Sequence, residues 1–411
     1  MQDFISQYLD YVGNTESPTT YNRWSCISMI GAYLGRQYSF KFGHFDIHPN
    51  KYIMLIGTPG ARKSTAIKVA KKIITQAGYN NISADKSSKE KFLLDLAGED
   101  TTDLSDMLEQ NIWGVKESGA SEMYIACDEF NDFIGNGNVE FISLLGNFWD
   151  WNGPPFESRI KNGKSVSIND PTISILGGNT PVNFARAFPP EILGQGFFSR
   201  LLLIHGEPTG KRITFPVPPD PAATAFIVEQ LIRIKSTVTG IATLTRTAEL
   251  LLDKIYQTEK PLEDIRFESY STRRFQHLLK LCLIISASDF STCIKESHVV
   301  CANTLLTHIE HLMPKALGEF GKSRNSDITH KIMSILDTAS KPIPLKEIWE
   351  YLHKDMEKVG DLAELLRNLA TADKVLIVNG GFLPHKRVIE EVASDILDYS
   401  YLSKEEREVS K

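Results

Sequence analysis

The sequence predicts an α/β fold built around a parallel β-sheet. Between about residues 38 and 207, short apolar runs alternate with amphipathic stretches whose apolar residues recur at helical spacing. The runs show no alternation of apolar and polar residues, which is typical of strands that are covered on both faces. We therefore expect buried parallel strands at residues 52–56, 123–127, 173–176 and 201–204.

Composition excludes several classes of protein. The 411 residues are 42% apolar and 23% charged with a formal net charge of −6, which excludes a disordered chain and a globally basic nucleic-acid-binding protein. The five cysteines are widely spaced without a CxxC pair, so we expect reduced thiols and no zinc site. The apolar runs are far shorter than the ~18 residues of a membrane helix, and the first residues lack a basic region, so we expect a cytoplasmic protein.

Helices are expected on both sides of the sheet. Residues 1–37 carry apolar residues at helical spacing and are predicted to form an N-terminal segment of two helices. The α/β core is expected to span residues 38–215. Residues 208–223 hold five prolines and cannot be helical until they end, so they mark a boundary. After it, residues 216–322 are predicted to form a helical lid domain.

The last part of the chain predicts a separate unit. Residues 323–390 contain three helical patterns followed by two short apolar runs around Asn379-Gly380-Gly381, which is a hairpin signal. Three helices followed by a β-hairpin are the pattern of a winged helix. The charged tail at residues 391–411 is expected to fray.

The strongest functional signal lies between the strand at 52–56 and the helical stretch after it. A glycine-rich loop followed by lysine and a hydroxyl residue at this place is a P-loop. Backbone N–H groups of such a loop point at phosphates, Lys63 neutralises the terminal phosphate oxygens, and the Ser64 hydroxyl is a ligand of Mg²⁺. The cofactors implied are ATP and Mg²⁺, and the loop consists of Gly57, Thr58, Pro59, Gly60, Ala61, Arg62, Lys63, Ser64 and Thr65.

Arg62 departs from the usual pattern, which has glycine before the lysine. Positive φ at this position costs an L-residue about 1–2 kcal/mol, an amount that a well-packed loop can absorb. The alternative interpretation is an ordinary glycine-proline turn before a helix.

Two carboxylates and an amide follow other predicted strands. Next to a P-loop, Asp128 is placed to hold hydrated Mg²⁺, and Glu129 is placed to polarise the attacking water. Asn179, after the strand at 173–176, could hydrogen-bond the γ-phosphate and this water. The alternatives are solvated acids at the end of a strand and an ordinary Asn-Thr-Pro turn.

Two arginines are candidates for completing the site. Arg200 precedes the strand at 201–204 and could project from the subunit edge into a neighbour's nucleotide site, where it would stabilise charge on the γ-phosphate. Arg273 opens a helix, where a basic residue opposes the helix dipole and so favours an anionic partner such as phosphate. The alternatives are a surface ion pair for Arg200 and a solvated side chain for Arg273.

A basic hairpin is predicted at residues 156–168. Alternation around Asn162-Gly163 indicates a tight turn, with Arg159, Lys161 and Lys164 near its tip. In a ring, these side chains would line the central channel and follow the phosphates of single-stranded DNA. Alternatively, they protect the edge of a solvated hairpin.

The candidate residues follow one another in the order 63, 128, 179, 200 and 273. This order resembles that of AAA+ ATPases, in which positions for nucleotide, magnesium and attacking water are followed by arginines, and the resemblance covers roughly residues 40–320. FFSRLLLIHG resembles the SRF arginine-finger strand of minichromosome-maintenance helicases, and STRRFQHLLKLCLIISAS resembles their sensor-2 helix. The hairpin lies where these helicases and the superfamily 3 viral helicases carry a DNA-tracking hairpin. LIGTPGARKSTAI is also similar to primase-helicase-type ATPases of phages.

This resemblance implies an AAA+ P-loop core with a helical lid and a winged helix, in a phage-type replicative DNA helicase. Such a protein would form a ring, expected to be a hexamer, that hydrolyses ATP between subunits and moves single-stranded DNA. It would act in the host cytoplasm, away from membranes, with replication proteins as further partners. Two other functions stay open. One is an ATP-dependent loader or remodeller of a protein partner, and the other is a nucleotide-gated DNA-binding switch with weak turnover.

Overall fold

A computed structural model describes residues 3–98, 121–135, 137–159, 165–188, 196–318 and 395–409, together with parts of 328–384. The chain divides into two compact units, of which the first is Met1–Phe320 with Asp395–Lys411 and the second is Gly321–Ser394. Within the described ranges, no helix is both long enough and apolar enough to cross a membrane.

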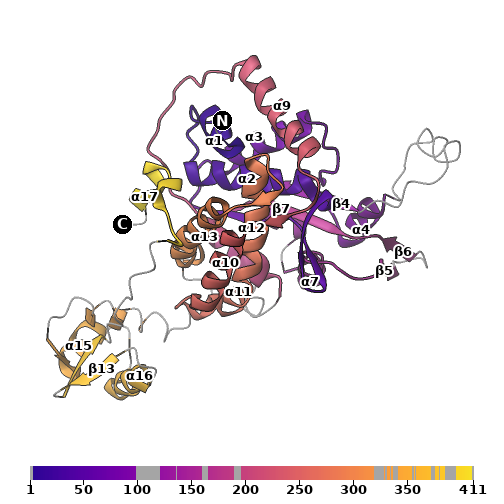
Figure 1. The fold of residues 1–411 in the computed structure, drawn as a ribbon. Helices are drawn as coiled ribbons and strands as arrows, with labels where there is room; N and C mark the ends of the chain where they lie inside the picture. Colours follow the sequence, from indigo (N-terminus) through magenta and orange to yellow (C-terminus); the bar gives the residue numbers. More distant parts are fainter. Residues whose placement is uncertain are drawn as a thin grey trace, which may run out of the picture. The chain divides into compact units, whose positions relative to one another are not determined.

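A sheet of four parallel strands lies in the first unit (Figure 1). Nearly every residue of these strands is buried, because helices flank the sheet, and this explains the unbroken apolar runs. The α/β class and the four predicted strands are therefore confirmed. In spatial order the strands are β4 (Glu122–Cys127), β7 (Thr172–Asn179), β3 (Tyr52–Ile56) and β8 (Leu201–His205).

The register of the sheet defines two opposite edges. Ile56 of β3 pairs with Asn179 of β7 and His205 of β8, whereas Tyr52 at the other end of β3 pairs with Leu201. Because the strands are parallel, the segments that follow β3, β4 and β7 begin along one edge, here called the carboxyl edge. The residues that precede β3 and β8 lie along the opposite edge, here called the amino edge.

Helices from distant parts of the chain pack around this sheet. The two predicted N-terminal helices are present as α1 (Phe4–Tyr11) and α2 (Thr19–Leu34). Helix α2 is buried over almost its whole length and packs on α3 (Lys63–Gln76) and β7. The apolar face of α3 is also buried, and it includes Ala66, Ala70, Ile73 and Ile74.

The segment after β8 begins without regular structure and then becomes helical, as predicted. Residues 208–220, here called the strap, contain no helix or strand. The helices that follow pack in the same compact unit as the sheet, with α13 against β8. They are α9 (Pro221–Thr237), α10 (Arg246–Thr258), α11 (Glu268–Ser271), α12 (Arg274–Ser288) and α13 (Glu296–Leu317).

Shorter elements complete the first unit. The helices among them are α4 (Lys89–Ala97), α6 (Phe130–Ile134), α7 (Val139–Asn147) and α8 (Pro181–Ala187). The strands pair in small sheets outside the central one and are β1 (Tyr38–Phe42), β2 (Phe45–Ile47), β5 (Phe156–Arg159), β6 (Ser165–Ile168), β9 (Gly240–Ile241), β10 (Thr243–Leu244) and β11 (Cys293–Ile294).

The second unit combines helices with a small antiparallel sheet. Its described elements are β12 (Ile343–Pro344), α15 (Leu345–Leu352), α16 (Val359–Thr371), β13 (Val375–Val378) and β14 (Gly381–Pro384). Val378 pairs with Gly381, which confirms the predicted hairpin. The unit has its own apolar core, which includes Ile332, Ile348, Leu362 and Leu366.

The C-terminal segment packs on the first unit, so the prediction that the charged tail frays is wrong for residues 395–409. Helix α17 (Lys404–Val409) lies beside α2 (Figure 1). The guanidinium of Arg23 donates to both carboxylate oxygens of Glu406, at 2.9 and 2.8 Å. Thr19 donates to Glu405 through its backbone N–H and its hydroxyl. A buried arginine on α2 requires a carboxylate partner, and the tail supplies it.

We expect Glu406→Gln to lower the free energy of unfolding by about 3–5 kcal/mol, because it leaves the buried Arg23 without its counter-ion. Burial raises the pKa of Glu406, but Arg23 and Ser403 outweigh burial and hold this pKa below its ordinary value of 4.5. The contribution of the pair is therefore present above pH 4.5 and is lost as the pH falls through the lowered pKa.

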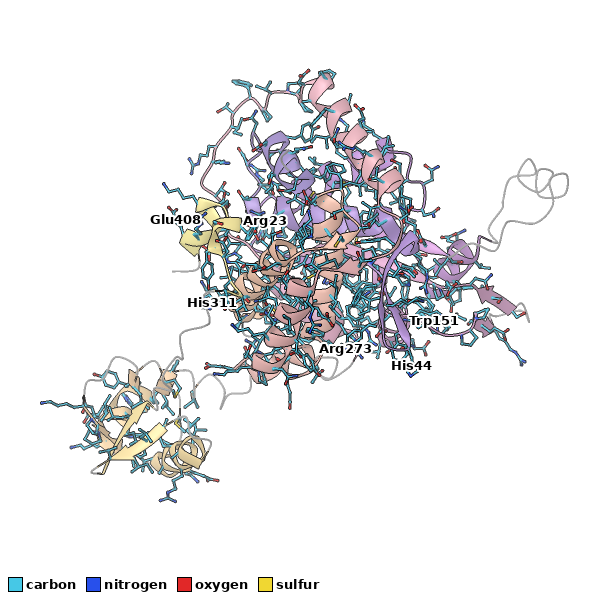
Figure 2. All side chains as sticks on the ribbon, viewed as in Figure 1. Arg23, His44, Trp151, Arg273, His311 and Glu408 are labelled. Carbon is cyan, nitrogen blue, oxygen red and sulfur yellow. The ribbon has the colours of Figure 1, made fainter. Side chains whose placement is uncertain are left out.

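Urea unfolding of the wild type and the variant between pH 3 and 7 would measure this difference. The matched control is Glu408→Gln, which changes an exposed carboxylate on the same helix (Figure 2). Equal stabilities of the two variants at neutral pH would contradict the role assigned to the Arg23–Glu406 pair.

Candidate functional site

The predicted P-loop joins β3 to α3, and a tyrosine from α2 holds its beginning in place. The hydroxyl oxygen of Tyr21 lies 2.8 Å from the carbonyl oxygens of both Ile56 and Gly206, which share its one hydrogen. Gly57 lies so close to Tyr21 that a Cβ at this position would collide with the hydroxyl oxygen. The first glycine of the loop is therefore required by packing.

Arg62 adopts the strained backbone that the sequence predicts. Its φ is 61° and its ψ is 27°, which is the left-handed region that glycine ordinarily occupies. One nitrogen of its guanidinium lies 2.5 Å from a carboxylate oxygen of Glu16, in the loop between α1 and α2. The side chain of Arg62 is thus anchored outside the loop while its backbone completes the turn into α3.

Lys63 is the first residue of α3, and its ammonium lies inside the loop. Its Nζ donates to the carbonyl oxygens of Gly57 and Thr58, at 2.8 and 3.0 Å. Burial lowers the pKa of Lys63, and the negative charge of Glu129 opposes this shift. Glu129, which follows β4, is therefore close enough to Lys63 for their charges to interact.

The carboxyl edge brings Asn179 and the acidic pair next to this loop. The N–H of Gly57 donates to the carbonyl oxygen of Asn179 at 3.4 Å. Asn179 is 2% exposed, and its amide donates to Asn131 at 2.7 Å. Asn131 in turn donates to the backbone of Asn183, whose amide lies 3.5 Å from a carboxylate oxygen of Glu129. The side chain of Asn179 is thus fixed by Asn131, and its amide oxygen also accepts a local hydrogen bond of 3.1 Å from the N–H of Thr180.

Asp128 lies on the face of α3 that carries Ser64. The ammonium of Lys68 is 2.8 Å from a carboxylate oxygen of Asp128. Lys68 is four residues after Ser64, so both side chains lie on one face of the helix. A hydroxyl and a carboxylate on the same side of the loop are the oxygen ligands that Mg²⁺ takes beside a nucleotide. The residues present therefore fit the predicted metal site.

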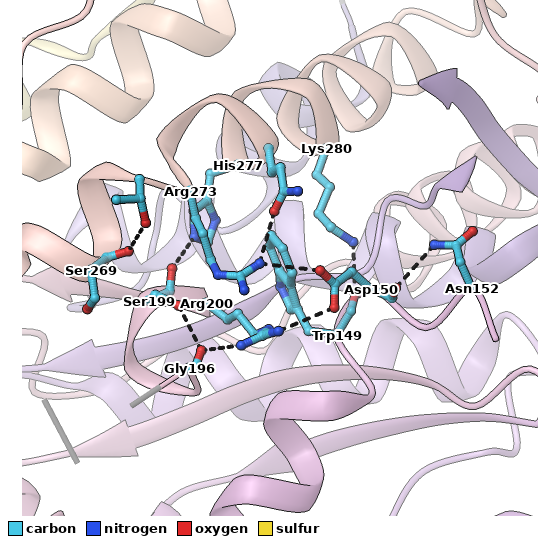
Figure 3. Close-up of polar contacts among 12 residues, drawn as sticks. Trp149, Asp150, Asn152, Gly196, Ser199, Arg200, Ser269, Arg273, His277 and Lys280 are labelled. Carbon is cyan, nitrogen blue, oxygen red and sulfur yellow. Dashed lines mark hydrogen bonds and ion pairs between the residues drawn. The ribbon is translucent and has the colours of Figure 1, made fainter. Parts of the chain in front are cut away.

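Arg200 and Arg273 are brought together, but not at the P-loop (Figure 3). Both contact the carboxylate of Asp150, with nitrogen–oxygen distances of 3.4 Å for Arg200 and 3.3 Å for Arg273. Arg200 also donates to the carbonyl oxygen of Gly196 and lies 6.0 Å from the ring of Trp149. Asp150 is the central residue of this cluster, and sequence reasoning missed it.

In a structure of one chain, projection into a neighbour's site stays a prediction for Arg200. Its side chain is only 11% exposed, because Asp150 and Gly196 hold it against Trp149, whereas the side chain of Arg273 is 28% exposed. Arg200 nevertheless has polar partners in Asp150 and the carbonyl oxygen of Gly196. The expected position of Arg200 directly before β8 is confirmed, and Arg273 directly precedes α12.

The arginine cluster lies at the amino edge of the sheet. Arg200 directly precedes Leu201, which pairs with Tyr52 at the beginning of β3, while the P-loop follows Ile56 at the end of β3. The length of β3, at roughly 3.3 Å per residue, separates the two positions by about 16 Å. This distance exceeds the length of an arginine side chain, so Arg200 does not reach a phosphate in the P-loop of its own chain.

Helix α12 fixes the arginine cluster through buried polar contacts. A ring nitrogen of His277 lies 3.0 Å from the carbonyl oxygen of Ser199, directly before Arg200. The ammonium of Lys280 donates to the carbonyl oxygen of Trp149 at 3.1 Å and to the side chain of Asn50 at 2.6 Å. Burial lowers the pKa of Lys280 to about 7. His277 and Lys280, one turn apart on α12, therefore position the two segments of the cluster. His277 holds the residue before Arg200, and Lys280 holds the residue before Asp150.

The predicted hairpin is present, with β5 and β6 antiparallel and Arg159 paired with Ser165. Arg159 is exposed, while Lys161 and Lys164 lie outside the described residues. The base of the hairpin packs on aromatic residues beside Asp150. The ring of Phe156 lies 4.9 Å from that of Phe148 and 5.8 Å from that of Trp151.

A cavity of about 640 Å³ adjoins the P-loop on the side of Arg62. Its walls come from three segments: the end of α1 with the loop after it, Arg62 with the first turns of α3, and the strap with the start of α9. Its lining combines apolar side chains such as Val69 and Ile213 with polar ones such as Asn14 and Thr65. Sequence reasoning did not find this cavity, because its walls are far apart in the chain.

No family model matches this sequence, and no curated protein matches it.

Proposed function

We propose that this protein is an ATP-dependent DNA helicase or translocase of phage-type replication, a ring-forming AAA+ ATPase with a helical lid and a C-terminal winged helix. The observation that carries the proposal is the division of the candidate site between two edges of one sheet. Lys63 lies at the carboxyl edge, while Arg200 and Arg273 share one carboxylate at the amino edge. Arginines in that position can serve a γ-phosphate only in another subunit, as in a ring whose sites lie between subunits.

The residues of the carboxyl edge have distinct roles in this proposal. The loop amides and Lys63 bind the β- and γ-phosphates, and Glu129, held by Asn183, orients the attacking water. Asn179, fixed by Asn131, contacts the γ-phosphate from the neighbouring strand. When bound at Ser64 and Asp128, Mg²⁺ neutralises charge between the phosphates. The cavity beside the loop receives the nucleoside.

Single-stranded DNA is the proposed substrate of the motor, with a hexamer as the expected assembly. The hairpin that carries Arg159 packs through Phe156 on Trp151, one residue from Asp150. A nucleotide that engages the two arginines would therefore act on a segment that touches the base of the hairpin. This contact supports a coupling between hydrolysis and movement of DNA.

ATP turnover with and without single-stranded DNA tests the proposal. We expect turnover that is stimulated by DNA and an assembly that contains several copies of the chain. Turnover that is indifferent to DNA would instead support a loader or remodeller of a protein partner. Tight ATP and DNA binding with almost no turnover would support a nucleotide-gated switch.

We expect replacement of Arg159, Lys161 and Lys164 by alanine to weaken single-strand binding and to remove the stimulation of turnover by DNA, while turnover without DNA is retained. The plot of log Kd against log salt concentration should become shallower by about 0.7 for each phosphate that no longer pairs with a basic side chain. Fluorescence anisotropy at several salt concentrations measures this slope.

A matched control removes three exposed positive charges elsewhere on the same unit, at Lys72, Lys86 and Arg246. An equal loss of DNA binding in both triple variants would mean that only net charge matters, and it would contradict a specific role for the hairpin.

A further inference from the structure

One carboxylate joins the three walls of the cavity beside the P-loop. Glu16 belongs to the loop between α1 and α2, and one of its oxygens lies 2.5 Å from the guanidinium of Arg62. Its other oxygen accepts a hydrogen bond of 2.7 Å from the N–H of Ile213 in the strap. The carbonyl oxygen of Glu16 also accepts from the hydroxyl of Thr209, at 3.2 Å. Glu16 therefore ties the strap to the P-loop.

The charge of Glu16 suits this role. The N–H of Ile213 and the guanidinium of Arg62 lower the pKa of Glu16, so the carboxylate is ionised at neutral pH. A hydrogen bond to an ionised acceptor is stronger than one between neutral groups. The contact also explains why an arginine is tolerated at the strained position 62, since its side chain has a fixed partner.

The strap has few other means of holding its position. Its four prolines lack N–H donors, and residues 208–220 form no helix or strand. Val217 lines the cavity and yet is 80% exposed, so this wall offers apolar surface that a ligand would cover. A cavity of about 640 Å³ is within the usual range for small-molecule sites, ~300–1,000 Å³.

We propose that Glu16 is a latch that holds the strap against the P-loop, so that the strap encloses the nucleoside of a bound nucleotide. The inference rests on the proposed function in one respect, namely that the P-loop binds the phosphates. Glu16 is a positioning residue, because it acts through Arg62 and the strap. The latch should affect only ligands that carry a nucleoside.

Calorimetric titration of the full chain with ADP and with inorganic tripolyphosphate tests the latch. We expect Glu16→Gln to weaken ADP binding about tenfold, which equals ~1.4 kcal/mol, and to leave the affinity for tripolyphosphate unchanged. Hydrogen exchange at the Ile213 amide should become faster in this variant, because its acceptor has lost its charge. The matched control is Asp253→Asn, which alters an exposed carboxylate on α10 outside the cavity and should change neither quantity.

A second variant separates the ion pair from the fold of the loop. Arg62→Gly removes the guanidinium and places glycine at a positive φ that it adopts without strain. In this background, Glu16→Gln should cost clearly less than tenfold in ADP affinity, because the coupling between the two side chains is already lost.

Three results would overturn the latch. They are an equal loss of affinity for tripolyphosphate, equal effects of Glu16→Gln and Asp253→Asn, and full additivity of Glu16→Gln and Arg62→Gly. A failure of the proposed function looks different, because ADP and tripolyphosphate would then bind no more weakly to a Lys63→Ala variant than to the wild type.

Discussion

Replacement of Lys63 by alanine is expected to reduce ATP turnover by at least two orders of magnitude, on the order of what the removal of one preorganised charge costs at such a site. The ammonium of Lys63 lies between the carbonyl oxygens of Gly57 and Thr58, at the mouth of the loop that would hold the phosphates. Without it, charge on the γ-phosphate has no lysine counter-charge. Phosphate release would measure the loss of turnover. Calorimetric titration with ADP would measure the accompanying loss of nucleotide affinity.

Lys72→Ala is the matched control, since it removes an exposed lysine from the same helix. We expect this variant to hydrolyse ATP like the wild type. Turnover that survives in Lys63→Ala, with or without DNA, would remove the basis for assigning this loop to phosphate binding.

Replacement of Arg200 by alanine is expected to lower turnover on the order of a thousandfold while ADP binding is retained, because an arginine supplied from a neighbour contributes mainly to the transition state. The position of Arg200 at the amino edge leads to a more specific expectation. A mixture of Lys63→Ala and Arg200→Ala subunits should regain activity that neither has alone. Random mixing leaves about one interface in four with both groups intact.

The mixing experiment needs two comparisons. Arg246→Ala, which removes an arginine at an exposed position, should retain full turnover. Arg200→Lys should show the same loss of turnover as Arg200→Ala, because an ammonium lacks the planar fork of donors. Retained turnover in Arg200→Ala, or full turnover by a strictly monomeric protein, would contradict a site that is shared between subunits.

The strands and the loop between β3 and α3 could be predicted from sequence because their signals are local. An apolar run covered on both faces, and a glycine-rich turn between a strand and a helix, each occupy a few consecutive residues. The positive φ of Arg62 could be predicted for the same reason, since the loop requires that backbone at that position.

The partners of the site residues could not be predicted, because they come from distant segments. Asp150 meets Arg273 across 123 residues, and Arg23 meets Glu406 across 383. A charged tail and a lone aspartate between two tryptophans carry no local sign of these partners. Asn131, two residues after Glu129, could have been suspected as a polar side chain at the same strand end.

The opposed edges of the sheet have a consequence for any assembly of the proposed kind. If each copy accepts a guanidinium on one side and offers one on the other, contacts are directional, and a two-fold symmetric pair would leave its catalytic centres unfinished. A linear row would always have one idle terminus, whereas a closed circle would have none. Specific activity should therefore rise with protein concentration until closure is complete.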